Sequence, residues 1–225
     1  MLNDCANRLL APLVPNSKGA EWLTNLESSG QQFHGHIPDT TILPASVFRT
    51  EEEANSLWEA VAENLIHHSV GPSNVWPIVD SIFEELALNA VQHSLSQSGS
   101  CATVECFTYG DEILYVVGVV DLGIGILSSL RNNPEYQYIN DEYNAISRAI
   151  ELDVTGTLEH RGAGLHHVTE RVQESSGELV IISGDGFLMV RNGQGPLRGD
   201  FIAQTWSSHP GTLVLVAIPI PHMRQ

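Results

Sequence analysis

The sequence predicts an α+β fold, a two-layer α/β sandwich in which helices cover one face of a mixed, mostly antiparallel sheet. Apolar residues recur at helical spacing after Thr50 and again over about residues 77–96. Nearly unbroken apolar runs predict strands at about 101–108 and 112–120. Two further apolar runs flank Gly184-Asp185-Gly186, a combination typical of a β-hairpin. Helices grouped beside such strands favour the sandwich.

The chain divides into an N-terminal extension, residues 1–40, and a main domain, residues 41–225. The extension has an unclear role, and we expect it to pack on the domain with one short helix over residues 20–27. The main domain opens with a capping box, Thr50 followed by Glu53, at the start of its first helix. The second helix is expected to begin near Pro77, whose fixed φ suits a first turn.

A long polar stretch follows the strands, from Gly123 to Arg161, with one helix expected at Asp141–Leu152. Connections of this length are either functional lids or disordered inserts, and we expect a mobile lid at about residues 127–161 with few anchors to the core. A helix then runs from Gly164 to about Gly177. Strands near residues 201–206 and 212–219 complete the predicted sheet.

The charge balance excludes several classes of function. The 225 residues include 27 acidic and 10 basic side chains, which gives a net charge of −17. Such a surface repels phosphate backbones and anionic lipids, so neither nucleic acid nor a membrane surface is an expected partner. The composition favours a cytoplasmic protein that binds a small ligand or another protein.

Targeting and cross-linking signals are equally sparse. The longest apolar run, Ile113–Val120, is too short for a membrane helix. The N-terminus lacks the basic region of a secretory signal, so no such signal is expected. Three cysteines without CxxC spacing predict neither disulfides nor a zinc ribbon and fit a reducing compartment. The paired histidines lack companion ligands at metal-site spacing, so a histidine metal site is not expected.

Polar residues interrupt the core face of the second helix. At 100° per residue, Asn89 and His93 interleave with Ile82 and Leu86, and Glu85 lies at the border of the solvated face. A polar group on an apolar face must find a partner or lose several kcal/mol of solvation. One interpretation is a buried Asn that bonds to the backbone; the other is a functional side chain facing a ligand.

The apolar strand at 112–120 delivers Asp121 to its end, where Gly123 and Gly125 let the backbone turn sharply. An Asx-type turn would explain this pattern. The functional alternative is a carboxylate that accepts a hydrogen bond from an exocyclic amine, such as that of adenine.

Gly162 and Gly164 precede a helix, and free backbone amides at a helix start can bind an anion. Hinges and tight turns use the same glycines. Thr212, which follows Gly211 at the last strand, could bond a ligand or simply suit a strand.

Taken in order, these features resemble the GHKL ATPase superfamily, which includes histidine-kinase catalytic domains, anti-sigma-factor kinases, type II topoisomerases and large heat-shock chaperones. Residues 85–93 (ELALNAVQH) are similar to its N box, residues 121–125 (DLGIG) to its G1 box, and residues 161–165 (RGAGL) to its G2 box. The resemblance covers about residues 41–220. It implies a Bergerat-type ATP-binding fold, and no P-loop lysine motif competes with it.

The resemblance also implies a role for each matching residue. Asn89 would coordinate Mg²⁺, and Glu85 would orient or deprotonate the attacking group. Asp121 would accept the adenine amine with help from Thr212. The remaining implied ATP-binding residues belong to the two glycine boxes: Gly123, Gly125, Arg161, Gly162, Gly164 and Leu165. The resemblance gives no clear role for His93, and the glycine series of the third box is shorter than usual.

The chain most resembles stand-alone members of the superfamily. It ends soon after Thr212 and Lys18 is its one lysine, so we expect no transducer domain. The resemblance to anti-sigma-factor kinases implies a Ser/Thr protein kinase, or a slow ATPase, that acts on a small STAS-like partner protein. The alternative is a non-catalytic switch that binds its partner only with ATP. Glu85 favours catalysis, and the sequence leaves the partner and a homodimer open.

Overall fold

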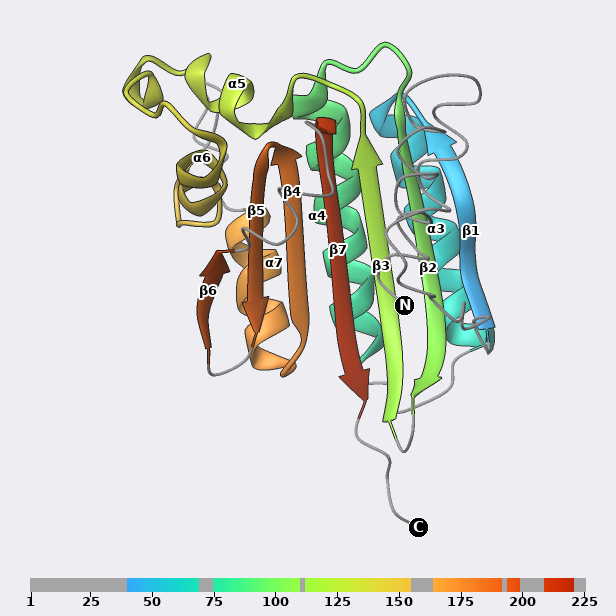
Figure 1. The fold of residues 1–225 in the computed structure, drawn as a ribbon. Coiled ribbons are helices and arrows are strands. Elements are labelled where there is room, and N and C mark those ends of the chain that lie inside the picture. Colours follow the sequence, from blue (N-terminus) through green and yellow to red (C-terminus); the bar gives the residue numbers. More distant parts are fainter. Residues whose placement is uncertain are drawn as a thin grey trace, which may run out of the picture.

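The computed structural model describes residues 40–68, 75–109, 112–154, 164–191, 194–198 and 209–220. Its strands form one seven-stranded sheet in the order β1-β2-β3-β7-β4-β5-β6 (Figure 1). Every described strand pair is antiparallel. The predicted α+β sandwich is therefore confirmed. The extension before Thr40 and the strand predicted near residues 201–206 lie outside the described residues.

The elements have the following bounds. The strands are β1 (Thr40–Phe48), β2 (Ser100–Tyr109), β3 (Glu112–Asp121), β4 (Glu178–Gly184), β5 (Gly186–Arg191), β6 (Gln194–Arg198) and β7 (His209–Ile220). The helices are α3 (Glu51–His68), α4 (Trp76–Ser94), α5 (Gly125–Arg131), α6 (Glu142–Ala149) and α7 (Gly164–Glu174), with a short 3₁₀ helix η1 at Pro134–Tyr136.

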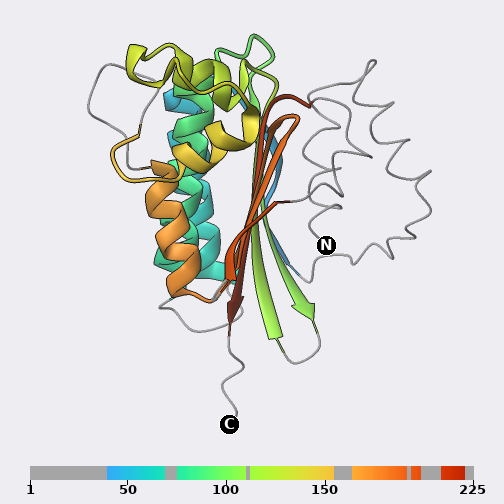
Figure 2. The same cartoon turned by 60° about the vertical axis from the view of Figure 1, so that its left-hand side comes forward.

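Helices α3, α4 and α7 lie together on one face of the sheet (Figure 2). Helix α4 is central, since it contacts both α3 and α7 as well as β3. Its buried Val79 and Phe83 join Tyr115 and Val117 of β3 in the hydrophobic core. This packing fixes the polar end of α4 beside the ends of β3 and β7.

The predicted helix starts are confirmed with one difference in detail. Thr50 Oγ1 accepts a hydrogen bond from the Glu53 amide at 3.1 Å, as a capping box requires. Glu53 Oε2 accepts from the Arg49 amide at 2.6 Å, one residue before the amide that the motif normally uses. Pro77 occupies the first turn of α4, and the helix ends at Ser94 before a left-handed Leu95.

The connection after β3 differs from its prediction. Only the helix at Asp141–Leu152 was expected, and it is present as the shorter α6, with Asp141 as its N-cap. Helix α5 and η1 were not predicted. Ile126, Leu130, Ile146 and Val154 are buried in the core, so the expectation of few anchors is wrong up to Val154. The apolar residues are widely spaced in a polar stretch, which hid their pattern; residues 155–161 lie outside the described residues.

The hairpin prediction is confirmed, because Ser183 pairs with Gly186 across the turn between β4 and β5. Strands β1 and β6 were not predicted. Register shifts interrupt β1, and β6 contains a glycine and a proline. Within the described residues, no helix combines the length and apolar character that crossing a bilayer requires.

Candidate functional site

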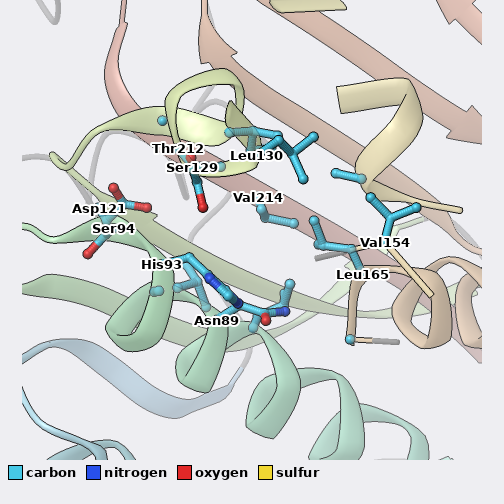
Figure 3. Close-up of a pocket in the computed structure, with 17 residues that line it drawn as sticks. Asn89, His93, Ser94, Asp121, Ser129, Leu130, Val154, Leu165, Thr212 and Val214 are labelled. Carbon is cyan, nitrogen blue, oxygen red and sulfur yellow. The ribbon is translucent and has the colours of Figure 1, made fainter. Parts of the chain in front are cut away.

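One pocket opens where α4, α5 and α7 meet the ends of β3 and β7 (Figure 3). It encloses about 780 Å³ of empty space, part of it open to solvent. The pocket brings together six predicted site residues from distant parts of the chain: Asn89, Asp121, Gly125, Gly164, Leu165 and Thr212.

Asp121 forms one end of the pocket. Strand β3 carries it there as its last residue, and its side chain is only 4% exposed. The Gly123 amide donates to Asp121 Oδ1 at 2.7 Å, and the Thr212 backbone amide also bonds the carboxylate. Burial raises the pKa of Asp121 from 3.8 to about 7, although these two hydrogen bonds oppose the rise. Asp121 is therefore a hydrogen-bond acceptor whose ionised form is disfavoured by burial. A ligand that donates a hydrogen bond to it would stabilise the ionised form.

The backbone around Asp121 is tightly packed. Gly211 has a φ of +89°, and a Cβ on it would overlap the Asp121 carbonyl oxygen and lie 2.7 Å from Asp121 Oδ1. Gly123 does not line the pocket; it packs against the backbone of Ser94 at the end of α4. Strand β7 can thus lie against Asp121 only because residue 211 lacks a side chain.

Asn89 lines the opposite end, beside the start of α7, and Glu85 lies next to it on α4. Asn89 Nδ2 is buried and finds no hydrogen-bond partner among the described residues. A Cβ on Gly164 would lie 2.7 Å from this nitrogen and 2.9 Å from Glu85 Oε2. The first residue of α7 therefore rests directly on the two α4 side chains that the sequence predicted to act together.

Glu85 is adjacent to the pocket and does not line it. Partial burial raises its pKa; the nearby His167 lowers it, and Glu84 adds to the rise. A carboxylate with a raised pKa is better suited to accept a proton than an ordinary surface glutamate. Glu85 is thus a partly buried carboxylate with a raised pKa beside the pocket.

His93 lies on α4 between Asn89 and the Asp121 end (Figure 3). Burial lowers its pKa below the ordinary 6.5, so it is neutral near pH 7. It offers a polar group without adding charge.

Sequence reasoning missed three serines near the site. Ser94 and Ser129 line the pocket close to Asp121 (Figure 3), and buried Ser183 accepts from the Ile126 amide at 2.8 Å. Ser129 belongs to the unpredicted α5, and Ser183 lies in a strand where serine is unremarkable. Their roles follow from tertiary packing, which gave no signal in the sequence.

Apolar side chains occupy the other walls of the pocket: Leu130, Val154, Leu165 and Val214 (Figure 3). Apolar walls with an acceptor at one end suit a flat heterocycle that carries an exocyclic amine. Arg161 and Gly162, two further predicted site residues, lie outside the described residues.

A metal at this site would depend on ligand oxygens. Among the described residues, no group of three or more His, Cys, Asp or Glu side chains could hold a metal ion. Mg²⁺, however, commonly takes one or two protein oxygens, together with substrate phosphates and water. Asn89 Oδ1 is the protein oxygen that could take that limited role, whereas the buried Nδ2 could only donate a hydrogen bond, for example to a phosphate oxygen.

No protein-family model matches this chain, and no match was found among the curated proteins. The functional assignment therefore depends on the motif residues and the geometry of the pocket.

Proposed function

We propose that the protein binds ATP with Mg²⁺ in this pocket. The observation that carries the proposal is that a buried carboxylate, Asp121, and a buried amide, Asn89, line one pocket from separate elements, and that Asn89 Nδ2 has no partner among the described residues. Asp121 would accept the adenine amine beside Thr212. The phosphates would lie towards Asn89 and the start of α7, where the helix dipole favours negative charge.

We further propose that the protein transfers the γ-phosphate to a Ser or Thr of a small cytoplasmic partner. The partner hydroxyl would attack the γ-phosphorus, its proton would pass to Glu85, and ADP would leave. Mg²⁺, when bound, neutralises charge on the phosphate oxygens. Positioning supplies most of the catalysis of phosphoryl transfer, so the protein alone should hydrolyse ATP slowly.

The acidic surface favours a partner with a basic or neutral docking face. The alternative function is a switch that binds its partner with ATP but transfers nothing. It requires the same pocket and makes no use of the raised pKa of Glu85.

Incubation with γ-labelled ATP and a co-purifying protein separates the two functions. We expect label on a Ser or Thr of that protein, located by mass spectrometry, and no label when Glu85 is replaced by Ala. ATP-dependent association without label would establish the switch. Failure of the full-length protein to bind ATP would reject both.

A further inference from the structure

The face of the sheet opposite the helices is also apolar. Side chains alternate along β3, so Tyr115 and Val117 point into the helix-covered core while Val116 and Val120 point to the second face. Strand register places further apolar residues beside them on this face: Cys101, Phe107, Val180, Ile182, Leu213, Leu215 and Ala217. Together they form what we call the second-face patch, which crosses β2, β3, β7 and β4.

The second-face patch is buried although no described element covers it. Val116, Val120 and Leu213 are each 0% exposed. Helices α3, α4 and α7 nevertheless lie on the other side of the sheet (Figure 2). Soluble monomers rarely expose an apolar patch of several hundred Å². An apolar face of this size needs a cover that the described residues do not supply.

We infer that residues 1–39 of the same chain dock on the second-face patch and form a third layer. Strand spacing and rise give the patch dimensions of roughly 15–20 Å in each direction. The next longest undescribed stretch, residues 199–208, has ten residues. Even fully extended, it could cover only a strip about as wide as one strand. The N-terminal segment is long enough to cover the whole patch.

The composition of residues 1–39 suits this place. The segment supplies apolar residues to meet the patch: Leu9, Leu10, Leu13, Trp22, Leu23 and Leu26. The chain also enters the sheet at β1, which pairs directly with β2. The C-terminal end of the segment is therefore connected to the sheet beside the patch.

This third layer would lie directly behind the Asp121 end of the pocket. Val120 precedes Asp121 in β3, and Leu213 follows Thr212 in β7. Both are in the second-face patch. The inference is independent of the ligand, since it concerns only what covers the sheet.

Photo-cross-linking in the full-length chain tests the docking. The photoreactive residue p-benzoylphenylalanine replaces Met189, a half-buried residue whose register partner is Val180 of the patch. Mixing isotope-labelled and unlabelled chains separates cross-links within a chain from those between chains. We expect mainly intrachain cross-links to residues 1–39, at least about tenfold more than from the same probe at exposed Glu63 on α3. Interchain products, or products confined to residues 199–208, would overturn the inference.

A variant of the segment gives a second test. The triple substitution Trp22→Ser, Leu23→Ser, Leu26→Ser should uncover the patch and raise the binding of a hydrophobic dye several-fold. A matched triple substitution of polar neighbours, Asn25→Ser, Ser28→Ala, Ser29→Ala, should leave dye binding unchanged. Equal dye binding by wild type and the apolar variant would contradict docking by residues 1–39.

Discussion

The two ends of the pocket differ in how completely their polar groups are satisfied. At one end, two backbone amides bond Asp121, and Gly211 allows β7 to lie against it. At the other end, Asn89 Nδ2 has no partner among the described residues, and Glu85 lies against Gly164 and near His167 of α7. One end is held by rigid backbone, and the other is formed by side chains with unused hydrogen-bonding capacity.

This difference suggests that the two ends have different roles in ligand binding. A rigid acceptor distinguishes ligands by their donors, because an ill-fitting ligand leaves buried polar groups unpaired. Side chains with unmet capacity can instead adjust when phosphate and metal arrive. We therefore expect substitutions at the Asp121 end to change selectivity and stability, and substitutions at the Glu85 end to change turnover.

The largest expected effect is on turnover. Glu85→Ala should lower phosphoryl transfer or ATP hydrolysis by about 100-fold or more, because a general base contributes that much. ATP affinity should stay within about threefold, since the base acts on the attacking group. Glu84→Ala, which removes the same charge one residue away, is the matched control and should retain turnover. Loss of ATP binding in Glu85→Ala would show that Glu85 has a different role.

A pair of glycine substitutions compares the two ends directly. Gly211→Ala should lower the free energy of unfolding by about 2 kcal/mol or more, because its Cβ would overlap backbone at a positive φ. Gly164→Ala meets only side-chain ends and should cost less than about 1 kcal/mol, while still disturbing Glu85 and Asn89. Chemical denaturation measures both. Equal losses would mean that the two ends are equally rigid.

A smaller effect is expected from pH. The pKa of Asp121 is about 7, so the fraction that is ionised rises about tenfold between pH 6 and pH 8. Adenosine, which has no titrating phosphate, should bind more tightly by up to that factor at pH 8. Asp121→Asn should show a flat profile. Tighter adenosine binding at the lower pH would contradict an ionised acceptor.

The same pKa shift predicts a pH dependence of stability. Burial raises the pKa of Asp121 in the folded state, so its contribution to stability is fully present below about pH 4 and is lost as the pH rises to about 7. Wild type should therefore lose stability relative to Asp121→Asn between pH 5 and pH 8. Thermal unfolding at several pH values measures the difference, and parallel curves would argue against a raised pKa.

The strands and helices that carry the site could be predicted because each repeats one pattern. Helix α4 places Asn89 among core residues at helical spacing, and β3 is an apolar run that ends at Asp121. The fold class followed from these elements and the β4–β5 hairpin. Local periodicity was sufficient wherever one face of an element is buried.

The parts that could not be predicted depend on tertiary contacts. Helix α5 is only seven residues long. In its first turn, the Ile126 amide donates a hydrogen bond to the hydroxyl of buried Ser183 in β4. No local sequence pattern predicts that hydrogen bond, because its two residues are far apart in the chain. Strand β1 likewise pairs with β2 despite a proline and register shifts. Short elements of this kind are stabilised by their neighbours more than by their own propensities.

Calorimetric titration with ATP and GTP in the presence of Mg²⁺ tests the central claim most directly. Wild type should bind ATP and discriminate against GTP, whose base presents a carbonyl where adenine has its amine. Asp121→Asn should bind ATP at least tenfold more weakly, because loss of a charged hydrogen bond costs about 1.5–3 kcal/mol. Equal affinities of wild type for ATP and GTP, or unchanged ATP affinity in Asp121→Asn, would contradict an adenine site at Asp121.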